Sequence, residues 1–273
     1  MAPTSLSPPS PAVLATRLRA AARPADPTRP AGAGPLVLVH GFTQTSRCWG
    51  PVDDELVADH DLVLVDAPGH GRSSTAVLDL VAGGRALAEA GGPGTYIGYS
   101  MGARLCLHAA LDQPERVERL VLISGTGGLD QAGDRAERRR SDQALADHVE
   151  AVGVAAFVDE WLRRPMFAGL PPERAHRVER LTNTSAGLAS SLRAAGTGTQ
   201  QPLWPRLGRM AMPVLVVAGA EDRKFVALAE RLAATIGGDA ELAVVARAGH
   251  TVHLEQPEAF LTRLRDWLTR TTP

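Results

Sequence analysis

The sequence is poor in cysteine and lysine, and it lacks any long hydrophobic run. Its two cysteines, Cys48 and Cys106, provide neither a disulfide framework nor a metal-binding set, and we expect no metal ion or cofactor. No apolar run approaches the roughly 20 residues of a membrane-spanning helix, so we expect a soluble, cytoplasmic protein.

Positive charge is not in excess. The 29 basic residues nearly balance the 30 acidic ones, for a formal net charge of −1. Proteins that bind nucleic acids or membrane surfaces concentrate positive charge, so we expect neither as a partner. Lys224 is the only lysine among the basic residues, a bias typical of a GC-rich genome. An arginine therefore indicates function only through its position.

The chain of 273 residues has the length of one α/β domain with room for an insertion. Short apolar runs alternate with helix-like stretches, and continuous runs of this length are typical of strands buried on both faces. We expect strands at residues 36–40, 62–66, 95–99, 120–124, 214–219 and 242–246, with a further first strand at 13–20. Helices are expected at residues 102–113, 225–236 and 257–270. This alternation predicts a mostly parallel sheet flanked by helices.

The alternation stops between residues 125 and 212. This stretch is polar, rich in arginine and mostly helical in pattern, and a structureless loop of that length would be unusual. Because it follows a strand, we expect it at the carboxyl edge of the sheet, where ligands bind. The predicted organisation is a disordered tail (1–11), a first core segment (12–124), a helical cap (125–212) and a second core segment (213–273).

Residues 98–102 read Gly-Tyr-Ser-Met-Gly, a match to the GxSxG pattern of a nucleophile elbow. In such an elbow the chain turns sharply from a strand into a helix, and the serine hydroxyl is exposed at the turn. An expected strand precedes Ser100 and an expected helix follows it. The context therefore predicts Ser100 as the reactive residue.

A serine hydroxyl needs a partner imidazole, oriented by an acid. His250 follows the last expected strand and is the favoured candidate, with His253 as the alternative. Asp222 follows the preceding strand and is favoured over its neighbour Glu221 as the orienting acid. The order Ser100, Asp222, His250 is the order that this kind of fold uses.

Two backbone amides are expected to form an oxyanion hole. One belongs to Met101, at the start of the elbow helix, where the helix dipole favours negative charge. The other is expected from Phe42, with Gly41 adopting unusual backbone angles that aim this amide inward. Residues 66–73 form another strand-to-turn segment. We interpret this rigid segment as structural, and we exclude Asp66 as the catalytic acid because it precedes the serine in the chain.

Residues 38–42 and 66–73, the elbow, and the Asp222 and His250 pair together resemble the α/β-hydrolase superfamily. The resemblance extends over residues 35–267, and it implies the α/β-hydrolase fold with a helical cap insertion. Haloalkane dehalogenases and epoxide hydrolases of this fold carry aspartate at the elbow, so Ser100 excludes them.

A narrower resemblance is carried by residues 98–104, 221–225 and 248–257 in the core, and by residues 136–142 and 165–167 in the cap. These segments are similar to the MenH family, the 2-succinyl-6-hydroxy-2,4-cyclohexadiene-1-carboxylate synthases of menaquinone biosynthesis. Ala103 departs from the pattern, since the family usually has glycine there. The resemblance implies a carbon–oxygen lyase that eliminates pyruvate from 2-succinyl-5-enolpyruvyl-6-hydroxy-3-cyclohexene-1-carboxylate, with Ser100 acting as a base.

The family's substrate is a small molecule with three carboxylates, which suit the planar fork of arginine. By motif position the resemblance implies substrate-binding roles for Tyr99, Arg104, Arg138, Trp161 and Arg180. Alternatively, Arg138 belongs to a solvated run with Arg139 and Arg140. The same Ser-His-Asp set could also hydrolyse an ester or a carbon–carbon bond in another carboxylate-bearing acyl substrate. A ligand-binding protein on a hydrolase scaffold is a third reading. The cap arginines, rather than the core motifs, distinguish a lyase from a hydrolase.

Overall fold

The computed structural model describes residues 13–22, 34–238 and 240–271, and the predicted tail at 1–11 lies outside these ranges. Within them the core is one seven-stranded sheet in the order β1-β3-β2-β4-β5-β6-β7. The strands are β1 (Thr16–Arg19), β2 (Leu36–Val39), β3 (Leu62–Val65), β4 (Gly94–Tyr99), β5 (Val117–Ile123), β6 (Val214–Gly219) and β7 (Ala240–Val245). Only the edge strand β1 pairs antiparallel, with β3. The predicted mostly parallel sheet is therefore confirmed.

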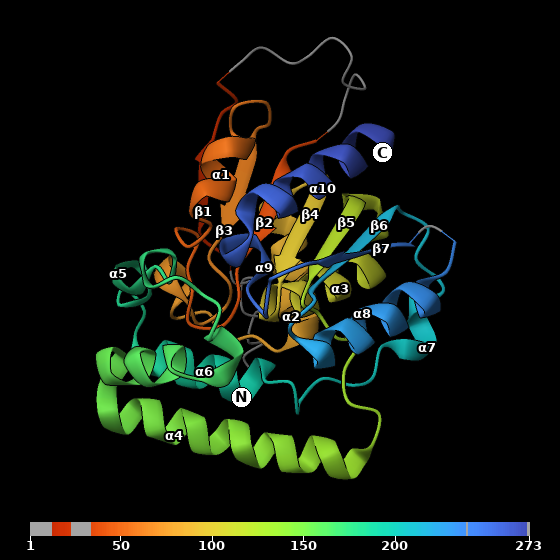
Figure 1. Ribbon diagram of the computed structural model, residues 1–273. Coiled ribbons are helices and arrows are strands. Elements are labelled where there is room, and N and C mark those ends of the chain that lie inside the picture. Colours follow the sequence, from red (N-terminus) through yellow and green to blue (C-terminus); the bar gives the residue numbers. More distant parts are fainter. Residues whose placement is uncertain (1–12, 23–33, 239, 272–273) are drawn as a thin grey trace, which may run out of the picture.

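Helices cover both faces of this sheet (Figure 1). They are α1 (Pro51–Leu56), α2 (Leu80–Gly91), α3 (Met101–Asp112), α8 (Arg223–Ile236), α9 (Val252–Glu255) and α10 (Pro257–Arg270), with 3-10 turns η1 (Gly71–Ser73) and η2 (Pro114–Arg116). Successive strand side chains point to opposite faces. In β2, Leu36 and Leu38 therefore pack on the side of α1 and α10, whereas Val37 and Val39 pack on the side of α2, α3 and α8.

Strand β5 begins earlier than the sequence indicated. Its first residues include charged side chains, so the apolar pattern did not reveal them. Arg119 is buried in the sheet, where its guanidinium donates to the hydroxyl of Thr95 at 2.9 Å. It also donates to the carbonyls of Leu268 and Thr271, at 3.1 and 2.9 Å. Hydrogen bonds to these three acceptors allow an arginine to occupy a strand position that the apolar pattern does not predict.

The chain between β5 and β6 is helical and forms a layer over the carboxyl ends of the strands (Figure 1). Residues 124–213 are all described and contain no strand. Their elements are α4 (Ala132–Leu162), η3 (Pro165–Phe167), η4 (Pro172–Arg174), α5 (Arg177–Arg180), α6 (Ser185–Ala195) and α7 (Trp204–Leu207). Gly153, with φ of 82°, divides α4 into two segments. Val149 and Phe157 of α4 pack against Leu188 and Leu192 of α6. In the described part of the chain, no helix is long and apolar enough to cross a bilayer.

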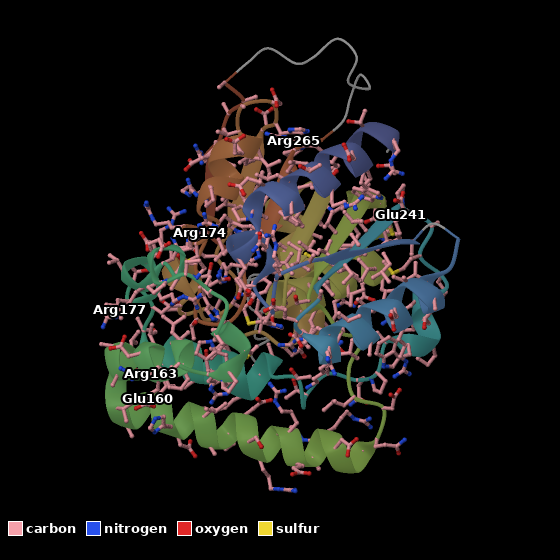
Figure 2. All side chains as sticks on the ribbon, in the orientation of Figure 1. Glu160, Arg163, Arg174, Arg177, Glu241 and Arg265 are labelled. Carbon is pink, nitrogen blue, oxygen red and sulfur yellow. The ribbon has the colours of Figure 1, made fainter. Side chains whose placement is uncertain are left out.

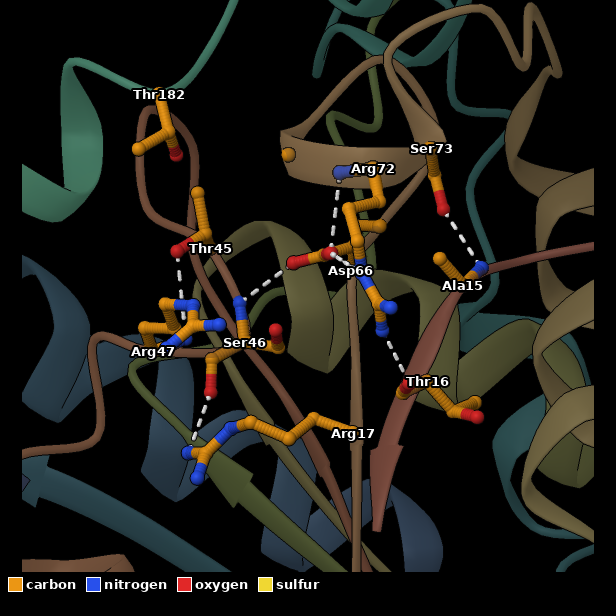
Figure 3. A network of polar contacts seen from close by, with 12 residues as sticks. Ala15, Thr16, Arg17, Thr45, Ser46, Arg47, Asp66, Arg72, Ser73 and Thr182 are labelled. Carbon is orange, nitrogen blue, oxygen red and sulfur yellow. Dashed lines mark hydrogen bonds and ion pairs between the residues drawn. The ribbon is translucent and has the colours of Figure 1, made fainter.

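The loops after β2 and β3 are joined by a buried carboxylate (Figure 3). Asp66 accepts hydrogen bonds from the backbone N–H groups of Ser46, at 2.7 Å, and Arg72, at 3.1 Å. Burial alone would raise the pKa of Asp66, but the positive field of His40 and these two N–H groups lower it. The Arg72 guanidinium donates in turn to the Thr16 carbonyl. The structure thus gives Asp66 a structural role beside the candidate site.

The glycines of the elbow allow α3 to approach the sheet closely. A Cβ atom added to Gly102 would lie 2.0 Å from the Val39 carbonyl oxygen, and one added to Gly98 would lie 2.6 Å from the carbonyl oxygen of Gly102. Both neighbours are backbone atoms, so neither contact can be relieved by rotating a side chain. The GxSxG pattern therefore reflects packing at both of its glycines.

Replacing Gly102 by Ala should lower the free energy of unfolding by about 3 kcal/mol, because α3 must move away from β2. Gly133 is the matched control, since a Cβ there would have no atom of the described residues within 4 Å. Gly133→Ala should leave stability unchanged or raise it by about 0.5 kcal/mol. Urea unfolding followed by circular dichroism measures both variants. Equal stabilities would contradict this account of the elbow.

Candidate active site

Ser100 lies at the turn between β4 and α3 with φ of 52° and ψ of −104°. A positive φ is strained for a residue with a Cβ atom and is typical of functional sites. The Ser100 N–H donates to the Ile123 carbonyl of the neighbouring strand at 2.8 Å, which holds the strained residue in place. This is the backbone geometry that the elbow motif predicts.

His250 connects Ser100 to Asp222. The Nε2 atom of His250 lies 3.1 Å from the Ser100 Oγ, and its Nδ1 atom lies 2.9 Å from the Asp222 Oδ2. With Asp222 ionised, Nδ1–H donates to the carboxylate, which leaves Nε2 free to accept the serine proton. Residues from three distant segments are thus brought into the geometry of a base-activated hydroxyl.

Asp222 follows β6 and caps α8, where its carboxylate also accepts from the Phe225 N–H at 3.3 Å. Burial acts to raise the pKa of Asp222, but the hydrogen bond to His250 and its charge outweigh burial, and the net effect lowers the pKa. Because its pKa is lowered, the Asp222 carboxyl stays charged at neutral pH and also at pH values somewhat below the usual pKa of an aspartate.

Ser124 and Glu255 hold the segment that carries His250, and neither was singled out by sequence analysis. Ser124 donates its hydroxyl to the His250 carbonyl at 2.7 Å. Glu255 accepts from the N–H groups of Gly249 and Thr251, at 2.7 and 2.8 Å. Glu255 stands within the motif at residues 248–257, whereas the only sequence signal for Ser124 was its position at the end of a strand.

The alternative residues have other surroundings. His253 is buried between the rings of Trp49 and Tyr99, with centroids 4.8 and 4.7 Å away. Burial, reinforced by the charges of nearby basic groups, lowers the pKa of His253 to about 3, so the ring stays neutral. Glu221 is exposed. The geometry therefore favours His250 and Asp222 over His253 and Glu221.

Phe42 and Met101 line the same cavity as Ser100. The Met101 N–H belongs to the first turn of α3, where no intrahelical acceptor exists. The Phe42 N–H has no hydrogen-bond partner among the described residues. Both amides are thus available to an oxyanion, and their role stays a prediction.

The expected role of Gly41 needs correction. Gly41 does not have a left-handed φ, and the left-handed residue of this loop is Thr43, with φ of 68°. Gly41 is required for space, since a Cβ atom there would lie 2.6 Å from the Tyr99 ring. Thr43 is held by its N–H, which donates to the Nε2 atom of His70 at 3.2 Å. Burial and the charge of His40 lower the pKa of His70 to about 3, so its ring stays neutral and can accept.

A cavity of about 380 Å³ separates the core from the cap above Ser100. A smaller space of about 20 Å³ adjoins it, because Ser100 and His250 line both. A larger groove of about 590 Å³ lies between β7 and α10, but it is lined by no serine or histidine. Within the described residues, no group of three or more His, Cys, Asp or Glu side chains is placed to hold a metal ion.

The three arginines expected to bind substrate all line these spaces. Arg104 and Arg138 line the cavity of about 380 Å³, and Arg180 lines the adjoining space of about 20 Å³. Arg104 is buried and donates to the Ala195 carbonyl at 2.8 Å. Burial, with the charge of Arg138, lowers the pKa of Arg104 to about 10, which leaves it charged at neutral pH. Arg138 also forms an ion pair with Asp142 at 2.8 Å.

Arg180, Tyr99 and Trp161 form the inner wall. Arg180 is buried, and burial lowers its pKa. It donates to the Ala175 carbonyl at 2.7 Å and to the Thr43 hydroxyl. The Tyr99 hydroxyl lies 3.2 Å from the Thr251 hydroxyl. The five expected binding residues are thus gathered around Ser100.

Comparison with known proteins gives consistent results. A family model described as alpha/beta hydrolase family matches residues 36–263. A protein of Serratia proteamaculans named 2-succinyl-6-hydroxy-2,4-cyclohexadiene-1-carboxylate synthase is 31% identical over 244 residues, which are 85% of this chain and 92% of that protein. A Bacillus subtilis protein that provisionally carries the same name is 37% identical over 252 residues, 86% of this chain and 90% of its own. The structure of MenH from S. aureus superposes with a TM-score of 0.83 at 29% identity, covering 93% of this chain and 97% of that one.

Replacing His250 by Ala should slow the labelling of Ser100 by a fluorophosphonate by at least about 1,000-fold, because the hydroxyl loses its base. His253→Ala removes a buried ring without touching the hydroxyl and should change the rate by less than about 10-fold. Mass spectrometry of the labelled protein measures both rates, with Ser100→Ala as the unlabelled control. A larger effect from His253→Ala would reverse the assignment.

Proposed function

The chain belongs to the alpha/beta hydrolase family, and within it to the 2-succinyl-6-hydroxy-2,4-cyclohexadiene-1-carboxylate synthases; from this premise we propose that it eliminates pyruvate from 2-succinyl-5-enolpyruvyl-6-hydroxy-3-cyclohexene-1-carboxylate in menaquinone biosynthesis. The product is 2-succinyl-6-hydroxy-2,4-cyclohexadiene-1-carboxylate. The observation that carries the proposal is the hydrogen-bonded set of Ser100, His250 and Asp222, of which Ser100 and His250 line a cavity whose charged wall residues are mostly basic.

In the proposed reaction Ser100 acts as a base. His250, oriented by Asp222, accepts the serine proton, and the serine oxygen removes a proton from the substrate ring. The electron pair forms the new ring double bond while the carbon–oxygen bond to the enolpyruvyl group breaks, and the departing group takes up a proton to become pyruvate. The amides of Phe42 and Met101 would stabilise the negative charge that develops on a substrate oxygen.

The charges of the cavity support a polyanionic substrate. Arg104 and Arg180 are buried and have no acidic partner among the described residues. A buried unpaired cation is unfavourable until an anion compensates it, and carboxylates pair with arginine through two parallel hydrogen bonds. A neutral ester would leave these cations uncompensated.

The direct test supplies the enolpyruvyl substrate and follows pyruvate with lactate dehydrogenase and NADH. Pyruvate should form well above the rate without enzyme, and Ser100→Ala should reduce the enzymatic rate by at least about 1,000-fold. Turnover of a neutral nitrophenyl ester with no pyruvate formed would instead indicate a serine hydrolase.

Replacing Arg104 by Gln should lower kcat/KM for this substrate, because a charge-assisted contact is lost. The expected loss of transition-state stabilisation is about 1–3 kcal/mol. Turnover of a neutral nitrophenyl ester, where detectable, should change little. Arg140 is exposed and does not line the cavity, so Arg140→Gln is the control for a loss of positive charge. Equal losses on both substrates would mean that Arg104 acts only through its bond to the Ala195 carbonyl.

A further inference from the structure

The cavity of about 380 Å³ above Ser100 has more basic wall residues than the motif positions predicted. Its charged wall residues are Arg104, Arg138, Asp142, Arg164 and Lys224. Asp142 is the only acid among them, and it is already paired with Arg138. Arg164 and Lys224 have no acidic partner in the described part of the chain, and neither was assigned a role by sequence analysis.

Arg164 is held by stacking rather than by a salt bridge. Its guanidinium carbon lies 4.3 Å from the centroid of the Trp161 ring, just beyond the end of α4. A stacked guanidinium keeps its N–H donors free, because they lie in its plane. These donors form no hydrogen bond to another described residue. Trp161 also makes an edge-on contact with Phe42, whose ring centroid lies 5.1 Å away. The stack therefore positions Arg164 relative to the loop beside Ser100.

The positive charge of Arg138 acts on Arg164. The pKa of Arg164 is lowered by its partial burial and by the positive charge of Arg138. The acid on this wall, Asp142, contacts Arg138 through Nε and leaves the other nitrogens of that guanidinium unbonded to described residues. An anion bound by both arginines would remove this repulsion and satisfy donors on each.

We propose that Arg164 binds a carboxylate of the substrate together with Arg138, and so forms a carboxylate-binding position on the cap. The assignment rests on the proposed function for the identity of the ligand, a cyclohexene that carries three carboxylates. Arg104 and Arg180 would then meet the remaining carboxylates at the inner end of the site. Arg164 thus serves to bind the polyanion and takes no part in the proton transfer.

The neighbouring arginine provides a matched control. Arg163 precedes Arg164 directly, is exposed near Glu160 at the end of α4 (Figure 2), and does not line the cavity. Arg163→Gln and Arg164→Gln remove the same charge from adjacent positions. Lys224 is a poorer test residue, because its charge also contributes to the low pKa of Asp222.

Binding can be measured without turnover in a Ser100→Ala background. Calorimetry with the enolpyruvyl substrate should show a roughly tenfold or greater rise in Kd when Arg164 becomes Gln, and no change when Arg163 becomes Gln. Arg164→Lys should restore part of the affinity, because it keeps the charge but loses the planar fork. In the enzyme with Ser100 intact, Arg164→Gln should raise KM for pyruvate release with kcat nearly unchanged.

The outcomes separate this proposal from the proposed function. Pyruvate release with equal affinities of the Arg163 and Arg164 variants would overturn the carboxylate position and leave the lyase in place. Binding that depends on Arg164, with no pyruvate released by the wild type, would support the position and overturn the lyase. Failure of the Ser100→Ala protein to bind the substrate, with no pyruvate released by the wild type, would overturn both. A loss of kcat without a change in KM would also contradict a binding role.

Discussion

The close approach of α3 to β2 is the constraint on which the candidate site depends. Without Cβ atoms at Gly98 and Gly102, the helix can begin directly at the end of β4, with the backbone of Ser100 in a left-handed conformation. This turn aims the hydroxyl away from the sheet and leaves the Met101 N–H without an intrahelical acceptor. The strained backbone of Ser100 is held in place by a hydrogen bond to the neighbouring strand and by packing on both sides of the sheet.

A second constraint is electrostatic. Arg104 and Arg180 are buried without an acidic partner among the described residues, which is unfavourable unless an anion compensates their charge. Arginine tolerates such burial because its pKa is far above neutrality, and even the lowered pKa of Arg104, about 10, leaves it charged. A buried lysine loses its charge more readily. The arginines of the cavity thus have a physical reason to be arginines, beyond the composition of the chain as a whole.

Much of the core follows from local patterns. The apolar runs predicted the parallel strands, and β6 and α10 begin and end at the predicted residues. The errors arose where tertiary contacts override local preference. Arg119 lies in a strand because distant carbonyls accept its hydrogen bonds, and Gly41 is small because the Tyr99 ring lies against it rather than because its φ is unusual. Neither contact leaves a signal in the surrounding sequence.

By itself, the sequence was sufficient to predict the class of fold and to identify Ser100, Asp222 and His250 as candidates, because these follow from strand periodicity, turn geometry and chain order. Only the tertiary structure decided which cations face the cavity and which of them are already neutralised. Arg163 and Arg164 are adjacent and identical in type, yet one is exposed and the other stacks on Trp161 in the cavity wall. That difference depends on how the end of α4 packs against the core, and a local pattern contains no such information.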